Sequence, residues 1–386
     1  MWRSVASNAL TLFIALLVAV AGVIGWGKAQ FASPGPLAQA ICLRVQPGSN
    51  MRRVSEDLDA EGALSSAAIF RIGVQYSDKA GLLKAGAFLV PAAASMVEIS
   101  EIVTRGGASS CGTEVVYRIG VNQAQMLVRE LDPASQAYQT VADFRPGTEG
   151  VVIPSEYVRV RGQTDTRYRI ALAEGATSWQ ILDALKAVDF LEGEAPTLPA
   201  EGSLAPDSYE VRAGSDLGAV VERMQQAQVG RLAEAWEGRA KDLPLKSPEE
   251  ALILASIIEK ETGVRSERAQ VASVFINRLN RGMRLQTDPT VIYGVTNGIG
   301  VLGRGLRQSE LRRETPFNTY VIPALPPTPI ANPGVAALQA ALNPASTDYL
   351  FFVADGSGGH AFAVTLREHN RNVANWRKIE AGRANQ

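Results

Sequence analysis

The stretch SPEEALILASIIEKETG, residues 247–263, is an apolar run that ends in two glutamates. Ser247 is a suitable helix cap, the proline after it suits the first helical position, and Glu250 completes a capping box. Gly263 supplies a stop, because glycine can adopt the left-handed backbone that other residues resist. These signals predict a helix over residues 248–262.

Helical spacing separates the two glutamates of this segment. Four residues follow the i, i+3, i+4, i+7 pattern and therefore share one face: Leu254, Ile257, Ile258 and Glu261. Glu259 points nearly the opposite way, and we interpret it together with Lys260 as solvated surface. Glu261 instead lies at the C-terminal end of the apolar stripe, beside the negative pole of the helix dipole.

Glu261 is a candidate general acid, because burial and the helix dipole both disfavour its ionised form and raise its pKa. A carboxyl group that stays protonated near neutral pH is what general acid catalysis needs. The alternative is a structural role, in which Glu261 closes a salt bridge at the helix end with Arg265 or Arg268. The helix pattern alone is compatible with both.

Composition limits the size and the partners of the protein. The chain has 386 residues, of which 46% are hydrophobic, and a formal net charge of −1. This length is enough for two or three domains that each bury a core. Nucleic acid is not expected as a partner, because phosphate contacts need clustered Lys and Arg and the chain has no basic excess. Small molecules, glycans or proteins remain.

The N-terminal segment contains an uncharged apolar stretch, residues 9–26, that is just long enough to span a bilayer as a helix. A cleaved signal peptide is the alternative, but its apolar region is usually shorter and no A-x-A site follows Gly27. We therefore predict an uncleaved membrane anchor over residues 1–27. Residues 28–40 are rich in Ala, Pro and Gly and are interpreted as a short tether.

Cys42 and Cys111 are the only cysteines of the chain. Outside the cytoplasm two cysteines can form one disulfide, whereas a pair of free buried thiols is the other possibility. The sequence does not decide between them.

A short unit recurs after the anchor: an alternating strand, a turn and an amphipathic helix. The three copies are residues 43–58, 117–131 and 168–185. Modules of this kind often bind or orient a polymer, and they are also common as scaffolding. Residues 144–166, which are punctuated by Gly and Pro, are interpreted as an insertion or an extra hairpin.

The C-terminal half combines helices with polar loops. A long helix is predicted over residues 218–236, a second amphipathic helix over 266–282 with Gly282 as a stop, and a Gly-turned hairpin over 349–366. The loops 283–294, 315–320 and 324–334 carry side chains that suit hydrogen bonding to sugar hydroxyls and amides. We predict that these side chains bind substrate: Gln286, Thr287, Asp288, Tyr293, Asn318, Tyr320 and Asn332.

No metal or cofactor is expected. His360 and His369 are the only histidines, and no Cys or His pair has ligand spacing. The GSGG stretch at residues 356–359 is a turn rather than a phosphate loop, because no G-K-S/T follows it. The carboxylate of Glu261 is left as the candidate for chemistry.

Several strings resemble those of the endolytic murein transglycosylases (YceG-like proteins): ASIIEKETG, SERAQVASVFINRLNRGMRLQTDPTVIYG, NTY, PPTPIANPG, AALNP and YLFFVADGSGGHAF followed by EHN. The resemblance is dense from Leu204 to Trp376. It implies an α+β protein with an N-terminal transmembrane helix, LysM-like α/β modules and a C-terminal mixed α+β catalytic domain. The implied domains are a LysM-like module at 41–107, an insertion or extra subdomain at 108–165, and the catalytic domain at 166–386.

The resemblance also implies an activity. The catalytic glutamate of the family corresponds to Glu261, and we add His360 to the predicted substrate-binding residues. A lytic transglycosylase needs one carboxylate, which protonates the oxygen between MurNAc and GlcNAc and then helps the MurNAc 6-hydroxyl attack C1. The product is a 1,6-anhydro sugar. A hydrolase requires a second carboxylate, for which Asp288 is the candidate.

We therefore expect a single-pass inner-membrane protein whose catalytic part lies in the periplasm and cuts nascent peptidoglycan strands internally, so that glycan elongation stops. The alternatives are a muramidase and a non-catalytic peptidoglycan-binding scaffold, and a scaffold has no need for an acid at Glu261. The resemblance implies peptidoglycan synthases as partners.

Overall fold

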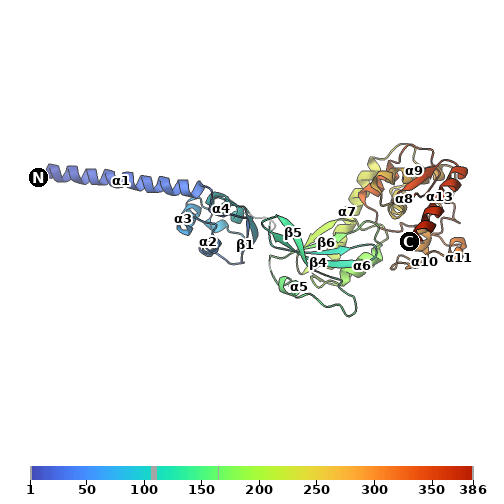
Figure 1. Ribbon diagram of the computed structural model, residues 1–386, viewed down its shortest axis with the longest axis horizontal. Coiled ribbons are helices and arrows are strands. Elements are labelled where there is room, and N and C mark those ends of the chain that lie inside the picture. Colours follow the sequence, from blue (N-terminus) through green and yellow to red (C-terminus); the bar gives the residue numbers. More distant parts are fainter. Residues whose placement is uncertain (1, 106–110, 164, 385–386) are drawn as a thin grey trace. The chain divides into compact units, whose positions relative to one another are not determined.

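The computed structural model describes residues 2–105, 111–163 and 165–384, and the chain forms two compact units. The first unit consists of residues 1–115, 127–143 and 153–167, and the second of 116–126, 144–152 and 168–386. The fold is mixed α+β with an N-terminal apolar helix (Figure 1). Each unit is described by itself.

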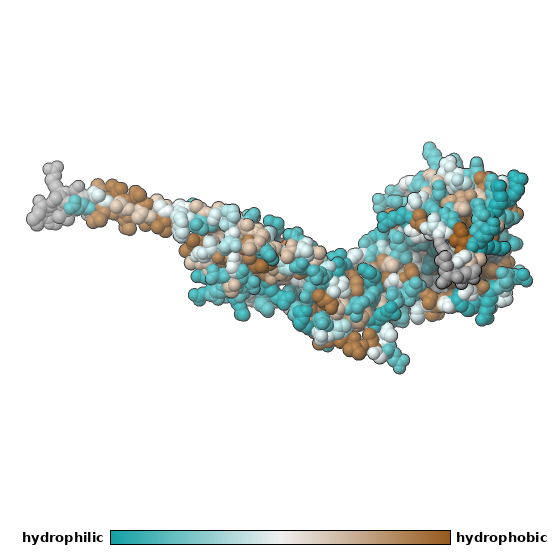
Figure 2. All heavy atoms as spheres, viewed as in Figure 1, coloured by the Kyte–Doolittle hydropathy of each residue, from teal (hydrophilic) through white to brown (hydrophobic). Residues whose placement is uncertain are grey.

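The N-terminal helix α1 spans Trp2–Ala32, and its stretch Leu10–Ala32 is long and apolar enough to cross a membrane. Figure 2 shows hydrophobic side chains along its surface. The predicted tether is different in the structure. The helix continues to Ala32, Leu37 is buried, and the Phe31 ring packs against Gly73 of α3 (Ala67–Tyr76). Residues 28–40 are therefore part of the folded first unit.

The first unit has a small core between a hairpin-like strand pair and three helices. Strands β1 (Ile41–Val45) and β2 (Gly86–Val90) are antiparallel. The helices are α2 (Met51–Ala60), α3 and α4 (Met96–Thr104), with a 3₁₀ turn at Ala80–Leu82. Their buried side chains include Leu58, Phe70, Val74, Val90 and Ile99. The strand-turn-helix pattern predicted for residues 43–58 is confirmed.

The two cysteines form a disulfide, Cys42–Cys111, which ties β1 to the segment before β3. The expected boundary between residues 107 and 108 lies outside the described residues.

The prediction of a second strand-turn-helix copy at residues 117–131 is wrong. It contains strands β3 (Thr113–Ile119) and β4 (Ala124–Asp132), joined by a turn. Its alternating apolar residues fit a strand as well as one helical face, and the sheet decides between them. These strands, with β5 (Ala137–Phe144), belong to a five-stranded sheet in the order β5-β4-β3-β6-β8. The described part of the predicted insertion 108–165, which also holds α5 (Ser155–Val160), therefore contributes strands to this sheet and is not a separate insertion.

The third predicted copy is confirmed. Strand β6 (Arg167–Leu172) pairs antiparallel with β8 (Ser208–Val211), with Tyr168 opposite Val211, and α6 (Ser178–Lys186) follows β6. A capping box at Thr177 starts α6. Two short parallel strands, β7 (Leu191–Glu192) and β9 (Ser215–Asp216), precede the long helix α7 (Leu217–Glu237).

Helix α8 (Pro248–Glu261) matches the predicted helix, and Ser247 caps it by accepting a hydrogen bond from the Glu250 backbone N–H. The predicted capping box is wrong in one of its two hydrogen bonds. The Glu250 carboxylate accepts from the backbone N–H of Lys246 at 2.6 Å, and not from that of the cap residue Ser247. The prediction that Gly263 ends the helix in a left-handed conformation is also wrong. The helix ends because Thr262 is extended, with φ −139° and ψ 128°.

The core of the second unit lies where α8 packs against α9 (Arg268–Asn280) and α12 (Val335–Leu342) (Figure 1). A 3₁₀ turn, Arg265–Glu267, precedes α9, and Gly282 follows it in the left-handed region at φ 64°, as predicted. Leu254, Ile257 and Ile258 are fully buried on the α8 face predicted from their spacing.

The remaining elements lie around this core. The predicted loop 283–294 is partly helical, because α10 (Asp288–Thr296) begins within it, and an acidic residue followed by proline favours a first helical turn. The short helix α11 (Gln308–Arg312) follows. The predicted hairpin is confirmed as antiparallel β10 (Phe351–Ala354) and β11 (His360–Ala363), and α13 (Leu366–Ala384) comes after it.

Candidate active site

Glu261 is the last residue of α8 and follows the buried stretch 253–258 after Glu259 and Lys260. The residue as a whole is partly exposed. The hydroxyl of Thr287 donates a hydrogen bond to Oε1 of Glu261. The structure thus brings the predicted acid against a predicted substrate-binding residue that lies 26 positions later in the chain.

Thr287 is held in place by its backbone. Gln286, just before it, has a left-handed φ of 52°, which leaves the Gln286 side chain exposed while Thr287 is buried. The Thr287 N–H donates to Oγ1 of Thr319 at 3.0 Å, and the Thr290 hydroxyl donates to the Thr287 carbonyl at 2.8 Å. The hydroxyl that contacts Glu261 is therefore fixed by a residue of α10 and a residue of the loop that carries Thr319.

The pKa of Glu261 is raised, and burial among protein atoms is the main cause. The negative charge of Asp288 raises it further, whereas the Thr287 hydrogen bond and the positive charges of His360 and Arg278 lower it. Burial outweighs these opposing effects. Among the described residues no salt bridge joins Glu261 to Arg265 or Arg268, and Arg268 pairs with Glu259 instead.

Asp288 and Tyr320 lie beside the acid and contact each other. The Tyr320 hydroxyl donates to Oδ1 of Asp288 at 2.7 Å, and burial raises the pKa of Tyr320. Asn318 supports this pair from below the surface. It is 1% exposed, its Oδ1 accepts from the Tyr320 N–H at 3.0 Å, and its Nδ2 donates to the carbonyl of Arg313 at 2.7 Å. Asn318 therefore positions the loop and does not face a ligand.

His360 approaches the acid from strand β11. Its Nδ1 lies 2.9 Å from Oε2 of Glu267, and its backbone N–H donates to Oε1 of the same carboxylate at 3.1 Å. Glu267 thus fixes both the ring and the strand. The two residues are 93 positions apart, and no sequence signal connects them.

Arg278 was missed by sequence reasoning. It is 7% exposed, and its guanidinium donates to the carbonyls of Leu350 at 2.7 Å and Leu285 at 2.5 Å. Its positive charge acts on Glu261, and burial lowers the pKa of Arg278. Its spacing of seven from buried Val271 places it on the apolar face of α9, which is a signal that could have found it.

The interpretation of Glu259 as solvated surface is wrong. Its side chain is 5% exposed, its Oε1 lies 3.3 Å from the guanidinium of Arg268, and its Oε2 accepts from the Gly334 N–H at 3.0 Å. The segment around Gly334 covers this side of α8, which helix periodicity cannot show. Lys260 is exposed as predicted, although its Nζ donates to the Gly175 carbonyl at 3.2 Å.

Tyr293 and Asn332 form a second group, around Glu201. Oε2 of Glu201 accepts from the Tyr293 hydroxyl at 3.2 Å, and its Oε1 accepts from Asn332 Nδ2 at 3.3 Å and from the Ser178 N–H at 2.9 Å. Burial raises the pKa of Glu201. Asn332 is fully buried and its Oδ1 accepts from the Leu204 N–H at 2.8 Å, so its amide holds loops together.

A cavity of about 340 Å³ lies in the same unit, and its wall is mostly apolar. The wall includes Lys260 and Pro289, the chain neighbours of Glu261 and Asp288, together with Tyr293, whereas Glu261 itself does not line it. A carboxyl group that keeps its proton because its pKa is raised can donate that proton to a bound ligand.

A family model for the YceG-like family matches residues 158–375, which is more than half of the chain. The chain belongs to the YceG-like family. The region of the YceG-like match contains Glu261 and all of the residues described around it.

Similar proteins include two curated endolytic murein transglycosylases. The one from Bacillus subtilis (strain 168) is 37% identical over 174 residues, 45% of this chain and 47% of that protein. The one from Streptococcus pneumoniae serotype 2 (strain D39) is 26% identical over 341 residues, 86% of this chain and 58% of that protein. This YceG-like chain thus spans about half the length of these relatives.

Among solved structures, a YceG-like protein from Listeria monocytogenes is similar to this chain. It is 24% identical, with a TM-score of 0.46, and the match covers 86% of this chain and 99% of that chain.

Proposed function

We propose that this protein is a membrane-anchored endolytic lytic transglycosylase that cleaves the bond between MurNAc and GlcNAc in nascent peptidoglycan strands. The observation that carries the proposal is the carboxyl of Glu261, whose pKa is raised by burial and which contacts the Thr287 hydroxyl instead of a cation. Membership in the YceG-like family and the two relatives named endolytic murein transglycosylase support the substrate class.

The proposed reaction uses Glu261 twice. Protonated Glu261 gives its proton to the glycosidic oxygen, so that the bond from this oxygen to C1 of MurNAc breaks and GlcNAc leaves with a hydroxyl. The resulting carboxylate then accepts the proton of the MurNAc 6-hydroxyl as that oxygen bonds to C1. The product is 1,6-anhydroMurNAc, no water is consumed, and Glu261 regains its proton.

Other residues have supporting roles in this proposal. Thr287 holds the Glu261 carboxyl in one orientation, and Arg278 holds the chain segment that leads to Thr287 through the Leu285 carbonyl. Gln286, Asp288, Tyr320, Tyr293 and His360 are proposed substrate contacts. Asn318 and Asn332, whose amides are bonded inside the protein, are proposed to act through the loops that they hold.

A muramidase is the second candidate, because Asp288 is close enough to influence the pKa of Glu261 and could activate water. Mass spectrometry of digested glycan strands separates the two reactions. We expect 1,6-anhydroMurNAc ends and strands of intermediate length, as internal cleavage produces. Reducing MurNAc ends that borohydride can label would make the protein a hydrolase. Absence of any cleavage by the folded protein would favour a binding scaffold.

We also propose that α1 anchors the protein in the inner membrane with the rest of the chain in the periplasm, where peptidoglycan is found. The length and apolar character of Leu10–Ala32 support the anchor. A reporter that is active only after export, fused after Gln386, should be active. Activity of a cytoplasm-specific reporter at the same position would contradict this topology. Peptidoglycan synthases are proposed partners on the basis of the family resemblance.

A further inference from the structure

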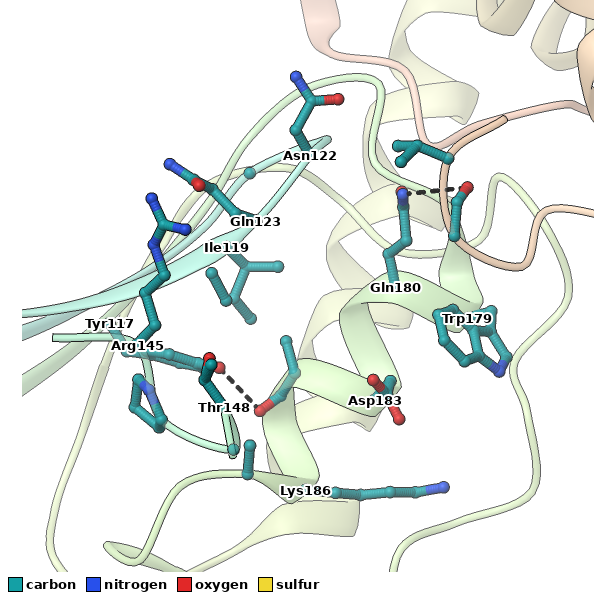
Figure 3. A pocket seen from close by; sticks show the side chains of 18 residues that line it. Tyr117, Ile119, Asn122, Gln123, Arg145, Thr148, Trp179, Gln180, Asp183 and Lys186 are labelled. Atoms are coloured by element: carbon teal, nitrogen blue, oxygen red, sulfur yellow. Dashed lines mark hydrogen bonds between the residues drawn. The ribbon is translucent and has the colours of Figure 1, made fainter. Parts of the chain in front are cut away.

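A second, larger cavity lies on α6 and is not used by the proposed acid. It has a volume of about 560 Å³ and opens between the β3–β4 turn, the loop after β5 and helix α6, all within the second unit. Trp179, Asp183 and Lys186 follow one another along α6 at positions i, i+4 and i+7, and therefore share a face (Figure 3). Gln123 and Arg145 come from the strand side.

Four polar side chains of this cavity are not used inside the protein. Asn122, Gln123, Arg145 and Lys186 are exposed, and within the described residues their side chains have no hydrogen-bond or ion-pair partner. The Trp179 ring is partly exposed beside them. Two carboxamides, two cations and an accessible indole thus converge on one hollow.

The α6 cavity adjoins the smaller cavity beside Lys260 and Pro289, which are the chain neighbours of Glu261 and Asp288. The two cavities share four lining residues: Asn122, Gln180, Gly300 and Val301. Gln180 forms the junction, because its Nε2 donates to the carbonyls of Val121 at 2.9 Å and Gly300 at 3.5 Å (Figure 3). The junction is thus part of the folded second unit, and the two cavities are neighbours along one path.

We infer that the α6 cavity is a remote subsite that binds a segment of the glycan strand several sugars away from the cleaved bond, an inference that rests on the proposed function. The Trp179 indole offers a flat face for the C–H surface of a sugar ring. The carboxamides of Asn122 and Gln123 can donate to and accept from N-acetyl and hydroxyl groups. Arg145 and Lys186 attract carboxylates carried by the strand.

This subsite predicts a preference for long substrates. A strand that fills both cavities gains binding energy that a short oligosaccharide, which fills only the cavity beside Lys260 and Pro289, does not. An internal bond would then be favoured over a bond near the end of the strand.

The test measures binding separately from cleavage, in full-length protein in detergent that also carries Glu261→Gln. The probe is fluorescently labelled glycan strands that retain their stem peptides. Trp179→Ala should weaken binding about 10-fold, because a stacked aromatic ring is worth on the order of 1.4 kcal/mol. Trp179→Phe keeps a ring and should stay within about 3-fold of the parent. Arg145→Ala should weaken binding at low salt and have less effect at high salt.

Gln226→Ala is the matched control, because Gln226 is an exposed residue of α7 whose amide contacts only its helix neighbour Glu222. The inference is overturned if Trp179→Ala binds strands as tightly as the parent while its thermal melting is unchanged, or if Trp179→Phe loses as much as Trp179→Ala. If the protein with an intact Glu261 cleaves nothing, the proposed function fails, and the binding measurement still decides whether the subsite exists.

Discussion

The last turn of α8 carries Glu259 on one side and Glu261 on the other, and the two regions differ in what meets the carboxyl group. The Glu259 carboxylate has the Arg268 guanidinium and the Gly334 N–H as partners. The Glu261 carboxyl accepts a hydrogen bond from the Thr287 hydroxyl. Burial raises the pKa of both. A raised pKa alone therefore does not identify a catalytic acid, and the two residues differ in their partners, a cation for Glu259 and a neutral hydroxyl for Glu261.

The largest effect is expected for Glu261→Gln, which keeps the shape of the side chain and cannot donate the proton. Cleavage of glycan strands should fall by at least ~10²-fold on general acid grounds, with circular dichroism unchanged. Glu249→Gln is the matched control, because Glu249 is an exposed glutamate of the same helix. Normal cleavage by folded Glu261→Gln would place the acid elsewhere.

Glu259→Gln should affect stability instead of chemistry, because it removes one of the two carboxylates near the buried Arg268 and leaves Glu174, 3.9 Å away. The raised pKa of Glu259 means that burial already disfavours its charge, so we expect the free energy of unfolding to fall by only about 1 kcal/mol. Urea denaturation measures this loss, and cleavage per folded molecule should stay within a few-fold of the parent. A large loss of cleavage at unchanged stability would mean that Glu259 takes part in the reaction.

Thr287→Val removes the hydroxyl that fixes the Glu261 carboxyl and keeps a side chain of similar shape. We expect the rate of cleavage to fall about 10-fold, because one hydrogen bond to a carboxyl group stabilises its orientation by roughly 1.5 kcal/mol. Thr287→Ser keeps the hydroxyl and serves as the control. Equal losses in both variants would mean that the contact is a matter of packing.

The smallest effect concerns pH. A folded-state pKa above the ordinary 4.5 means that the folded protein holds a proton that the unfolded chain releases, so the parent loses stability as pH rises above 4.5 toward the raised pKa. Glu261→Gln lacks this loss and should become more stable relative to the parent across that window. Cleavage by the parent should fall over the upper part of the same window, as the acid ionises. A stability difference that is constant from pH 4 to 8 would contradict the raised pKa.

Local signals in the sequence were sufficient where neighbours along the chain decide the structure. Ser247 and its proline predicted the start of α8, the apolar spacing predicted its buried face, and Gly282 predicted the end of α9. The hairpin of β10 and β11 followed from its glycine turn. The strings around Glu261 also indicated the family.

Hydrophobic periodicity alone gave a wrong prediction where residues far away in the chain decide the secondary structure. Residues 117–131 fitted a strand followed by a helix and form two strands, because pairing in the five-stranded sheet satisfies their backbone groups. The end of α8 was mispredicted for a local reason. Thr262, and not Gly263, leaves the helix, and its hydroxyl accepts a hydrogen bond from the Val264 N–H at 3.0 Å.

The sequence by itself determined that Glu261 ends an apolar helical face and that polar loops follow it. Only the tertiary structure decided that Thr287 contacts this carboxyl, that Arg268 goes to Glu259, and that Asn318 and Asn332 are buried supports. The physical reason is one of range. Helical periodicity fixes which side of an element is apolar, whereas the burial and partners of a charged group depend on segments that are tens of residues away in the chain.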